Sequence, residues 1–559
     1  MQKIIWTCWF QGRDEAPDLV KRCLASWERE NPDWEVRCLD SRTVGRYLDI
    51  PEYLDLDCQT ITAASLSDII RIFLLHEYGG AWVDATLYCN RPLDDWLPGA
   101  MGTGFFAFDA PAPDRMLASW FLACEPGNGI VAKWAARCAE YWRNRDQSED
   151  YFWFHHQFSE LLEVDPEARA EWEVVPRISA DGAHFFQTYD AMYQQASEWV
   201  HKIDWTTPVF KLTHRISSEL YRPGCLLHQF LNRFDFNEGS TSAKSLRREH
   251  SAMPFAATKV STDNLGDHIQ SLAANRLLAR LGIEPQLCVD RDNEIATSAK
   301  LTEFGCPVGI LVNGWFKTNP REWPPHPNLV PLYLGFHIRP SQSSTLISDA
   351  AIENYRKHGP IGCRDNYTLS LLHRHGVDAF LSNCLSLILP RRLEYPARQD
   401  QVFVVSRDDQ ILDRIPEDLG PIRFVSHYSG STDFEENMRK AADLLTLYRT
   451  RARLVITTLL HCALPAIAMG IPVIVFYPQG TGGGDQSDGE RFSTLERMIR
   501  VFHFDETHKI DWRGRVVEAS QYKLALIDAF HSMMKRWQLP PEPVVGPIAP
   551  SAALPVPTH

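Results

Sequence analysis

The sequence predicts an α/β protein with more than one domain. Short apolar runs rich in Val and Ile recur along the chain, and segments with helical spacing of apolar residues separate them. This alternation is typical of parallel strands that are covered by helices on both faces. At 559 residues the chain is also too long for one hydrophobic core. The stretch 237–254 loses the apolar period and gathers Ser, Gly and charge, so we expect a linker there.

The linker divides the chain into two expected domains. The first covers residues 1–236 and the second covers residues 255–538. The second domain is expected to have two lobes, about 255–395 and 396–538, because its strand series has two halves. The Pro-rich end, 539–559, is expected to be a disordered tail.

Composition excludes several classes of function. A hydrophobic fraction of 44% with 23% charged residues is that of an ordinary soluble protein, and we find no apolar run of the roughly 18 residues that a membrane span needs. The net charge of -14 argues against a nucleic-acid partner. The 13 cysteines are scattered without a CxxC pair, so we expect reduced thiols. The short, aromatic N-terminal run predicts a core strand rather than a signal peptide, and hence a cytoplasmic protein.

The first domain opens with an expected strand, "KIIWTCWF", a helix from about Ala16 to Asn31 and a second strand, "WEVRCLD". A further helix over Ala63 to Glu77 is apolar on nearly every face, so it should be buried. Asp68 and Arg71 stand three residues apart on it and can pair with each other. Both a structural ion pair and a pair that faces a cleft fit this pattern.

The segment that follows favours the cleft. Gly79 and Gly80 end the helix, and "AWVDATLYC" alternates as a strand that brings Asp84 to its carboxyl end. Ligands collect at such strand ends in open α/β sheets.

These residues resemble the motif "SDxxRxxxLxxxGGxxxDxD" of capsular polysaccharide synthesis proteins and related glycosyltransferases. The similarity extends over roughly residues 1–230, including "IIWTCWFQG" and "NPDWEVRCLD". It implies a GT-A-like domain that binds a nucleotide-sugar. The matching residues are Ser67, Asp68, Arg71, Gly79, Gly80, Asp84 and Thr86.

The resemblance also implies roles in the donor site. Trp9 would stack on the nucleobase, Asp68 and Arg71 would hold sugar hydroxyls and phosphate, and Asp84 would face the ribose or a metal and take part in catalysis. Carboxylates accept sugar hydroxyls well, and Arg offers planar donors to a diphosphate. The expected donor-site residues are Trp9, Ser67, Asp68, Arg71, Asp84 and Thr86.

The motif departs from its commonest form at Thr86, where relatives have a second Asp. Because Mn²⁺ and Mg²⁺ prefer carboxylates, this change weakens the expected metal site or moves it to another ligand. We expect Mn²⁺ or Mg²⁺ with Asp84 and His214 as ligands, offsetting charge on the departing nucleoside diphosphate. His155 and His156 are expected in packing or acceptor binding rather than in metal binding.

The second domain begins with "FAATKV", and a helix follows in "NLGDHIQSLAANRLLARLG". Its apolar residues recur at helical spacing, and Asn264, Gly266 and Asp267 form the turn before it. Later runs, "VGILVNGWF", "LVPLYLGFHI", "QVFVVS", "IRFVSH", "RLVITT" and "IPVIVFYP", are expected parallel strands.

Two later helix starts carry charged or titratable groups. Pro465 is tolerated only in a first turn, so we expect that helix to start near Cys462, with Leu460 and His461 at its mouth. Arg364 and Asp365 precede another helix in the same way. A helix N-terminus binds anions, and Arg and His facing one cleft would suit a ligand with phosphate and carboxylate groups.

These segments resemble the polysaccharide pyruvyltransferase family over about residues 255–505. The resemblance implies a GT-B-like pair of Rossmann-type lobes that moves a pyruvyl ketal from phosphoenolpyruvate to a sugar. Relatives often have Arg at the position of Leu459, which leaves the donor open. The implied phosphoenolpyruvate-binding residues are Asn264, Asp267, Arg364, Leu460 and His461; Arg364 and His461 are catalytic, and His461 protonates the methylene carbon.

Together the motifs predict a bifunctional transferase of capsular or exopolysaccharide biosynthesis. Its expected partners are a nucleotide-sugar, phosphoenolpyruvate and a saccharide acceptor, free or lipid-linked, with no nucleic acid, no transmembrane segment and no cofactor in the second domain. Peripheral contact with the inner face of the membrane is left open. The alternatives are that the second domain is another glycosyltransferase or a non-catalytic polysaccharide-binding module.

Overall fold

The computed structural model describes most of the chain. All but the last two residues of the expected linker at 237–254, and the expected tail at 539–559, lie outside the described residues. Among the described helices, none combines the length and the apolarity that crossing a membrane requires. The described residues are 1–54, 61–217, 220–233, 253–291, 301, 306–316, 323–395, 398–406, 409–478 and 492–536.

The chain divides into two compact units. The described residues of the first unit lie within Met1–Glu249, and those of the second lie within His250–Pro543. Each unit is an α/β structure built on its own sheets, as the alternating apolar pattern predicts. The α/β class and the parallel-sheet lobes of the second unit are therefore confirmed.

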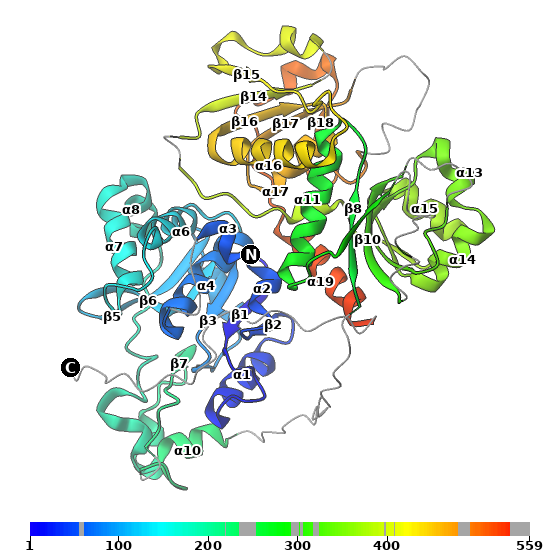
Figure 1. Cartoon of the computed structure of the whole chain (residues 1–559). Coiled ribbons are helices and arrows are strands. Elements are labelled where there is room, and N and C mark those ends of the chain that lie inside the picture. The colour runs from blue at the N-terminus through cyan, green and yellow to red at the C-terminus, as the bar shows by residue number, and fades with distance from the viewer. Residues whose placement is uncertain are drawn as a thin grey trace. The chain divides into compact units, whose positions relative to one another are not determined.

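The first unit is built on a mixed sheet with the strand order β2-β1-β3-β6-β5 (Figure 1). β1 pairs in parallel with both β2 and β3, whereas β3 and β6 are antiparallel. The antiparallel hairpin of β5 and β6 was not among the strands that the sequence predicts. The strands are β1 (Ile4–Cys8), β2 (Glu35–Leu39), β3 (Gly80–Val83), β5 (Phe105–Ala112) and β6 (Arg115–Cys124).

Helix α4 (Ala63–Tyr78) is the buried helix that the sequence predicts. The Thr62 side chain caps it by accepting from the Ser65 N–H, and Gly79 ends it at φ 67°. A Cβ on Gly79 would lie 2.6 Å from the Pro126 nitrogen, and a Cβ on Gly80 would lie 2.7 Å from the Ile4 carbonyl oxygen. The double glycine therefore lets α4 turn directly into β3.

The sequence predicts one continuous strand after Gly80, but the structure has two strands there. β3 ends at Val83, a turn carries Asp84 to Thr86, and β4 (Leu87–Cys89) pairs with β7 (Val209–Lys211) in a separate small sheet. The turn breaks the strand because the Leu87 N–H bonds to the Asp84 carbonyl oxygen at 2.8 Å. Asp84 still lies at the carboxyl end of β3, as predicted.

The other helices of the first unit surround these sheets, and α1 packs against β2 and β4. A buried apolar cluster, which includes Leu24, Phe186, Phe210 and Phe230, joins α1 to the later part of the unit. The helices are α1 (Asp18–Glu30), α2 (Val44–Tyr47), α3 (Ile50–Tyr53), α5 (Leu97–Ala100), α6 (Gly129–Trp142), α7 (Trp153–Val164), α8 (Pro166–Glu173), α9 (Ala196–Trp199) and α10 (Leu226–Leu231).

The second unit contains two parallel sheets, one in each lobe. The first has the order β13-β12-β11-β10-β8-β9 and packs helices α13 (Ser343–Leu346), α14 (Asp349–His358) and α15 (Asn366–Arg374) around a core that includes Phe336 and Tyr355. Its strands are β8 (Phe255–Lys259), β9 (Leu287–Asp290), β10 (Val308–Trp315), β11 (Leu329–His337), β12 (Ile361–Cys363) and β13 (Ala379–Leu381).

The second lobe has the strand order β15-β14-β16-β17-β18 around a core that includes Ile456 and Phe476. The strands are β14 (Gln401–Val405), β15 (Ile422–Phe424), β16 (Ala452–Thr457), β17 (Val473–Phe476) and β18 (Val501–Phe502). Its helices include α16 (Phe434–Arg451) and α17 (Leu460–Ala468), and α19 (Ser520–Arg536) returns to contact β11.

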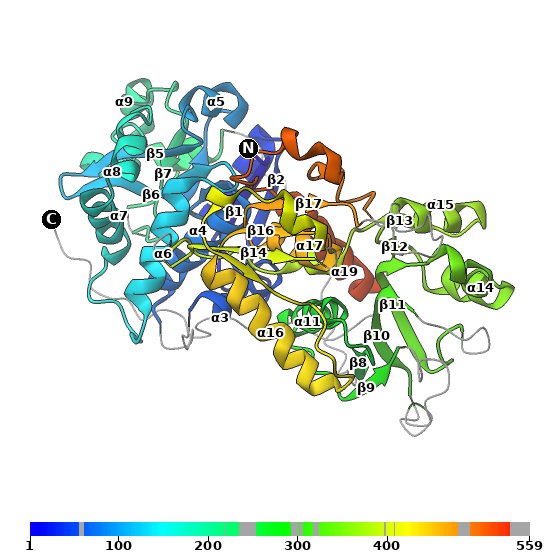
Figure 2. The same cartoon turned by 90° about the horizontal axis from the view of Figure 1, so that it is seen from above.

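Helix α11 (Leu265–Arg280) ties the two lobes of this unit together. It belongs to the first lobe by sequence and contacts β8 and β10, yet it packs along α16 and touches α17 of the second lobe (Figure 2). The start of α11 is thereby placed beside the start of α17, where the sequence predicts the second site.

Candidate functional site

Arg71 is the centre of a charged cluster in the first unit. Its side chain is 5% exposed and donates to Asp68 on the same helix and, at 2.9 Å, to Asp84 Oδ1 at the end of β3. The rings of Trp82 and Phe154 lie 5.2 and 5.5 Å from its guanidinium carbon. The predicted pairing of Asp68 with Arg71 is therefore present, and the same arginine also orients Asp84.

Asp84 is held by cations on both of its oxygens. Oδ1 accepts from Arg71 and, at 3.2 Å, from Trp82 Nε1, and Oδ2 accepts from Lys211 Nζ at 3.0 Å. Burial alone would raise the pKa of Asp84, but the charges of Lys211 and Arg71 outweigh it and hold the pKa well below its usual range. Asp84 is therefore a firmly ionised acceptor.

Asp68 behaves differently from Asp84. Burial raises the pKa of Asp68 to about 7; the charge of Arg71 opposes this shift and the charge of Asp84 adds to it. The two carboxyl groups that share Arg71 therefore have pKa values shifted in opposite directions. Near neutral pH the site has one permanent carboxylate and one that can carry a proton.

Lys211 was not predicted from the sequence. It lies at the end of β7, and the pairing of Leu87 with Lys211 between β4 and β7 brings it across to the turn after β3. Its ammonium donates to Thr86 Oγ1 at 2.7 Å as well as to Asp84. In the sequence, Lys211 stands three residues before His214 in "VFKLTH". The sequence analysis singled out only His214 from this segment.

The remaining predicted donor-site residues are Trp9, which follows the strand paired with β3, and Ser67, which lies next to Asp68. Trp9 follows β1, is half-buried, and meets the exposed ring of His214 edge-on at a centroid distance of 5.3 Å. Ser67 precedes Asp68 on α4 and is half-buried. His214 thus lies against Trp9, three residues beyond Lys211.

The predicted metal ligand Asp84 lies between side-chain cations. Among the described residues, no group of three or more His, Cys, Asp or Glu side chains could hold a metal ion. Both oxygens of Asp84 accept from side-chain cations, and Thr86 accepts from Lys211. This donor set does not fit Mn²⁺ or Mg²⁺, which prefer several carboxylate oxygens.

His155 and His156 of α7 are not equivalent. His156 is exposed and contacts Asp150 at 3.2 Å. Burial, with the charges of Arg71 and Arg115, lowers the pKa of His155 to about 3, so this imidazole is neutral at physiological pH. His155 packs edge-on against Phe152 and Phe154, as a packing residue would.

In the second unit, the start of α11 contacts His461. Asn264 caps α11 by accepting from the Gly266 N–H at 3.0 Å, and Gln270, one turn later, lies 3.4 Å from His461 Nδ1 through its Nε2. A Cβ on Gly266 would lie 2.8 Å from the Cβ of His461. The glycine in "NLGD" is therefore required for the close approach of the two segments.

Helix α17 begins at Leu460, two residues before the predicted start, and Pro465 lies inside it. His461 has φ -84° and ψ 16°, which are not helical, so the regular helix follows His461. The early start arises because the Leu459 carbonyl oxygen accepts from the N–H groups of both Cys462 and Ala463. His461 lies at the mouth of the helix, as predicted, and is 5% exposed.

Asp267 is also part of this group. It is buried, accepts from Thr262 Oγ1 at 3.1 Å and Gln270 Nε2 at 3.3 Å, and lies 3.4 Å from a guanidinium nitrogen of Arg291. Arg291 and Gln270 were not predicted as site residues, although Gln270 lies in the quoted segment "NLGDHIQSLAANRLLARLG". Thus Asn264, Asp267 and His461 come together, linked by Gln270.

Arg364 follows β12 of the first lobe, beside Asp365 and His337. It is fully buried, and its Nε is 3.9 Å from Asp365 Oδ2, the oxygen that also contacts His337 Nδ1 at 2.5 Å. Asp365 caps α15 through the Thr368 N–H, as the sequence indicates. Burial would raise the pKa of Asp365, but His337 and then Arg364 hold it below its usual value.

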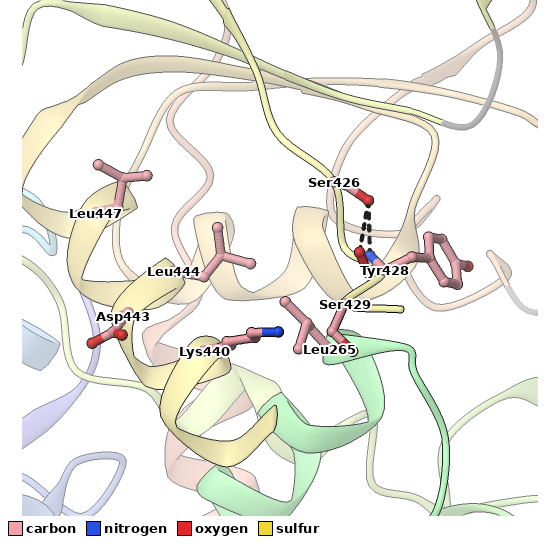
Figure 3. Close-up of a pocket in the computed structure, with 8 residues that line it drawn as sticks. All are labelled: Leu265, Ser426, Tyr428, Ser429, Lys440, Asp443, Leu444 and Leu447. Carbon is pink, nitrogen blue, oxygen red and sulfur yellow. Dashed lines mark hydrogen bonds between the residues drawn. The ribbon is translucent and has the colours of Figure 1, made fainter. Parts of the chain in front are cut away.

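A surface hollow of about 400 Å³ lies where the start of α11 meets α16. Figure 3 shows the residues that line it. Ser426 accepts from the Tyr428 N–H at 3.0 Å on one side of it. The predicted residues Arg364 and His461 are not among its lining residues. The lining residues are Leu265, Ser426, Tyr428, Ser429, Lys440, Asp443, Leu444 and Leu447.

Comparison with protein families supports the two-part organisation. Residues 1–231 match the family described as capsular polysaccharide synthesis protein, and residues 264–480 match the family described as polysaccharide pyruvyl transferase. Both resemblances that the motifs indicate are therefore confirmed. The fold and these matches define an α/β chain with a glycosyltransferase-like first part and a pyruvyl transferase-like second part.

Relatives in fungi share part of the chain. The O-glycosyltransferase braB of Annulohypoxylon truncatum is 30% identical over 162 residues, and the glycosyltransferase afumC of Aspergillus fumigatus is 29% identical over 157 residues. Each match covers 25% of this chain and 38% of the relative. The chain therefore spans well under half the length of these relatives.

Solved structures show only distant similarity. PaToxG glycosyltransferase is 15% identical with a TM-score of 0.23, covering 31% of this chain and 74% of its own. The glycosyltransferase GlyE of Streptococcus pneumoniae TIGR4 is 11% identical with a TM-score of 0.25, covering 56% of this chain and 91% of its own. At these scores the similarities carry no argument about fold or activity.

Proposed function

We propose that the chain is a bifunctional transferase of surface-polysaccharide assembly. Its first unit transfers a sugar from a nucleotide-sugar to a saccharide acceptor, and its second unit transfers a pyruvyl group from phosphoenolpyruvate to a sugar as a ketal. The observation that carries the proposal is the cluster in which buried Arg71 orients both Asp68 and Asp84 at the carboxyl end of β3.

The geometry of this cluster supports sugar binding. An ionised carboxylate accepts two hydroxyls, and Asp84 is kept ionised and fixed by its neighbours. Arg71 uses its terminal nitrogens on Asp68 and Asp84, so it acts by positioning these carboxylates. Trp9 follows β1, which pairs in parallel with β3, so this aromatic residue lies at the same edge of the sheet as Asp84 and could stack on a nucleobase.

Sugar transfer requires little further chemistry from the protein. The bond between the anomeric carbon and the diphosphate oxygen breaks, and the oxygen keeps the electron pair. The acceptor hydroxyl forms the new bond to that carbon and loses its proton. Side-chain cations at the diphosphate stabilise the charge that develops on the leaving group.

The group around His461 supports the second transfer. In its imidazolium form His461 can pass the Nε2 proton to the methylene carbon of phosphoenolpyruvate and return to the neutral imidazole, and the Gln270 amide, 3.4 Å from Nδ1, positions the ring. The adjacent carbon becomes electrophilic, two hydroxyls of one sugar add to it, and inorganic phosphate leaves. The two hydroxyl protons restore the proton that His461 gave and protonate the phosphate.

The proposal is tested by mass spectrometry of products from the full chain. The protein is incubated with an acceptor oligosaccharide, a panel of nucleotide-sugars and phosphoenolpyruvate, together and separately. We expect a gain of one sugar residue and a further gain equal to pyruvate less water. A product with two added sugars, or no change with phosphoenolpyruvate, would instead favour a second glycosyltransferase or a binding module in the second unit.

A further inference from the structure

Lys211, at the end of β7, brings its ammonium to the turn after β3, where relatives with a second Asp would bind a metal. Lys211 Nζ lies 3.0 Å from Asp84 Oδ2 and 2.7 Å from Thr86 Oγ1, so it bridges the two motif positions. We propose that Lys211 takes the place of the divalent cation and that sugar transfer in this chain is independent of metal. The inference rests on the proposed glycosyl transfer and adds which group stabilises the negative charge of the leaving diphosphate.

The charges of the motif balance in this arrangement. Two carboxylates with a divalent cation are neutral in sum, and Asp84 with Lys211 is also neutral. Had position 86 been Asp, the ammonium would face two carboxylates and leave a net negative charge toward a diphosphate. Thr86 instead accepts a hydrogen bond without adding charge. Thr86 and Lys211 are thus matched in charge.

The position of Lys211 suits contact with a diphosphate. Its side chain is 18% exposed, so it is partly shielded from water but reachable by a ligand. An ammonium has three N–H donors, and Asp84 and Thr86 take two of them among the described residues. The third can donate to a phosphate oxygen as the nucleoside diphosphate leaves.

The surroundings fix this lysine in place. β4 and β7 pair in register, with Leu87 opposite Lys211, and the Leu212 N–H donates to the Thr86 carbonyl oxygen at 3.0 Å. The cation is therefore anchored through backbone on both sides of the turn. Such preorganisation is what a group needs in order to stabilise leaving-group charge without reorganising.

The test is isothermal titration calorimetry of UDP and of GDP into the full chain, in EDTA and in Mn²⁺. We expect one of the two nucleotides to bind the wild type in EDTA with an affinity within about threefold of that in Mn²⁺. Lys211→Met should weaken binding in EDTA by about tenfold or more, the loss expected for one charge-assisted hydrogen bond, and Lys211→Arg should keep most of it.

Two further variants make the test specific. Thr86→Asp combined with Lys211→Ala should make nucleotide binding require Mn²⁺, and electron paramagnetic resonance should then detect bound Mn²⁺. Lys133→Met is the matched control, because Lys133 is 17% exposed and also contacts two acidic side chains, Asp165 and Glu167, away from the cluster. It should leave nucleotide binding unchanged.

The outcomes separate this inference from the function on which it rests. Binding by the wild type only with Mn²⁺, or unchanged binding by a folded Lys211→Met variant, would overturn the role of Lys211 and leave sugar transfer intact. Failure of both nucleotides to bind under either condition would overturn nucleotide use by the first unit, and the role of Lys211 with it.

Discussion

The two candidate sites are built in different ways. In the first unit, two acidic and two basic side chains form ion pairs at the carboxyl end of β3. They come from α4, from the turn after β3 and from β7. In the second, a histidine at a helix mouth is positioned by close backbone approach and a neutral amide, while the predicted arginine is fully buried with Asp365. The first site depends on charge balance, and the second on the fit of two segments.

The largest effect should follow removal of the charge at Asp84. Asp84→Asn leaves Arg71 and Lys211 without their shared carboxylate, so sugar transfer should fall about 100-fold or more, with a loss of about 3 kcal/mol in the free energy of unfolding. Product formation and urea unfolding measure the two effects. Asp114→Asn, at an exposed acid paired with Arg115, is the control and should change neither.

The next effect concerns the acid of the second site. His461→Gln keeps a polar group but cannot protonate carbon, so pyruvyl transfer should fall by about 100- to 1,000-fold, while sugar transfer stays at the wild-type rate. Separate assays of the two transfers measure this difference. His508→Gln replaces an exposed histidine of the same unit and should have no effect. Equal loss of both transfers would contradict the independence of the sites.

A smaller effect should follow from crowding at the start of α11. In Gly266→Ala the new Cβ would meet His461 at 2.8 Å and Asn264 at 3.1 Å, so one segment must shift. We expect a loss of about 1–3 kcal/mol in stability and reduced pyruvyl transfer, with sugar transfer unchanged. Gly102→Ala, where a Cβ has nothing within 4 Å, is the control. Unchanged pyruvyl transfer in Gly266→Ala would show that this contact does not position His461.

The smallest effect is a pH dependence in the first unit. The folded protein holds the Asp68 proton up to a pKa of about 7, against 3.8 for an ordinary Asp. The stabilising contribution is therefore present below pH 3.8 and is lost as pH rises through 7. The free energy of unfolding of Asp68→Asn should rise relative to wild type across this range, as denaturant titrations at several pH values would show. A constant difference would contradict the raised pKa.

Much of the first site could be predicted because it is local in sequence. Asp68, Arg71, the double glycine and Asp84 lie within one helix and the end of the strand after it, so helical spacing pairs the first two and the strand end places Asp84. Thr86 was recognised as a departure through the resemblance to the family motif. The double glycine was correctly assigned to the turn, since its backbone conformation excludes a Cβ.

The parts that could not be predicted depend on pairing between distant segments. Lys211 is 127 residues from Asp84, and only the pairing of β4 with β7 brings them together. Gln270 is 191 residues from His461, and they meet through the packing of α11 on the other lobe. The motif for Arg364 indicated a ligand contact, but only the fold shows how deeply it is buried.

The most direct test compares the products that three proteins make from the same substrates. Wild type, Asp84→Asn and His461→Gln are each given nucleotide-sugars, phosphoenolpyruvate and two acceptors, one of which already carries the added sugar, and the products are weighed by mass spectrometry. We predict that Asp84→Asn loses only sugar addition and that His461→Gln loses only the pyruvyl gain. Loss of both gains in either folded variant, or of neither, would contradict two separate transfer sites in one chain.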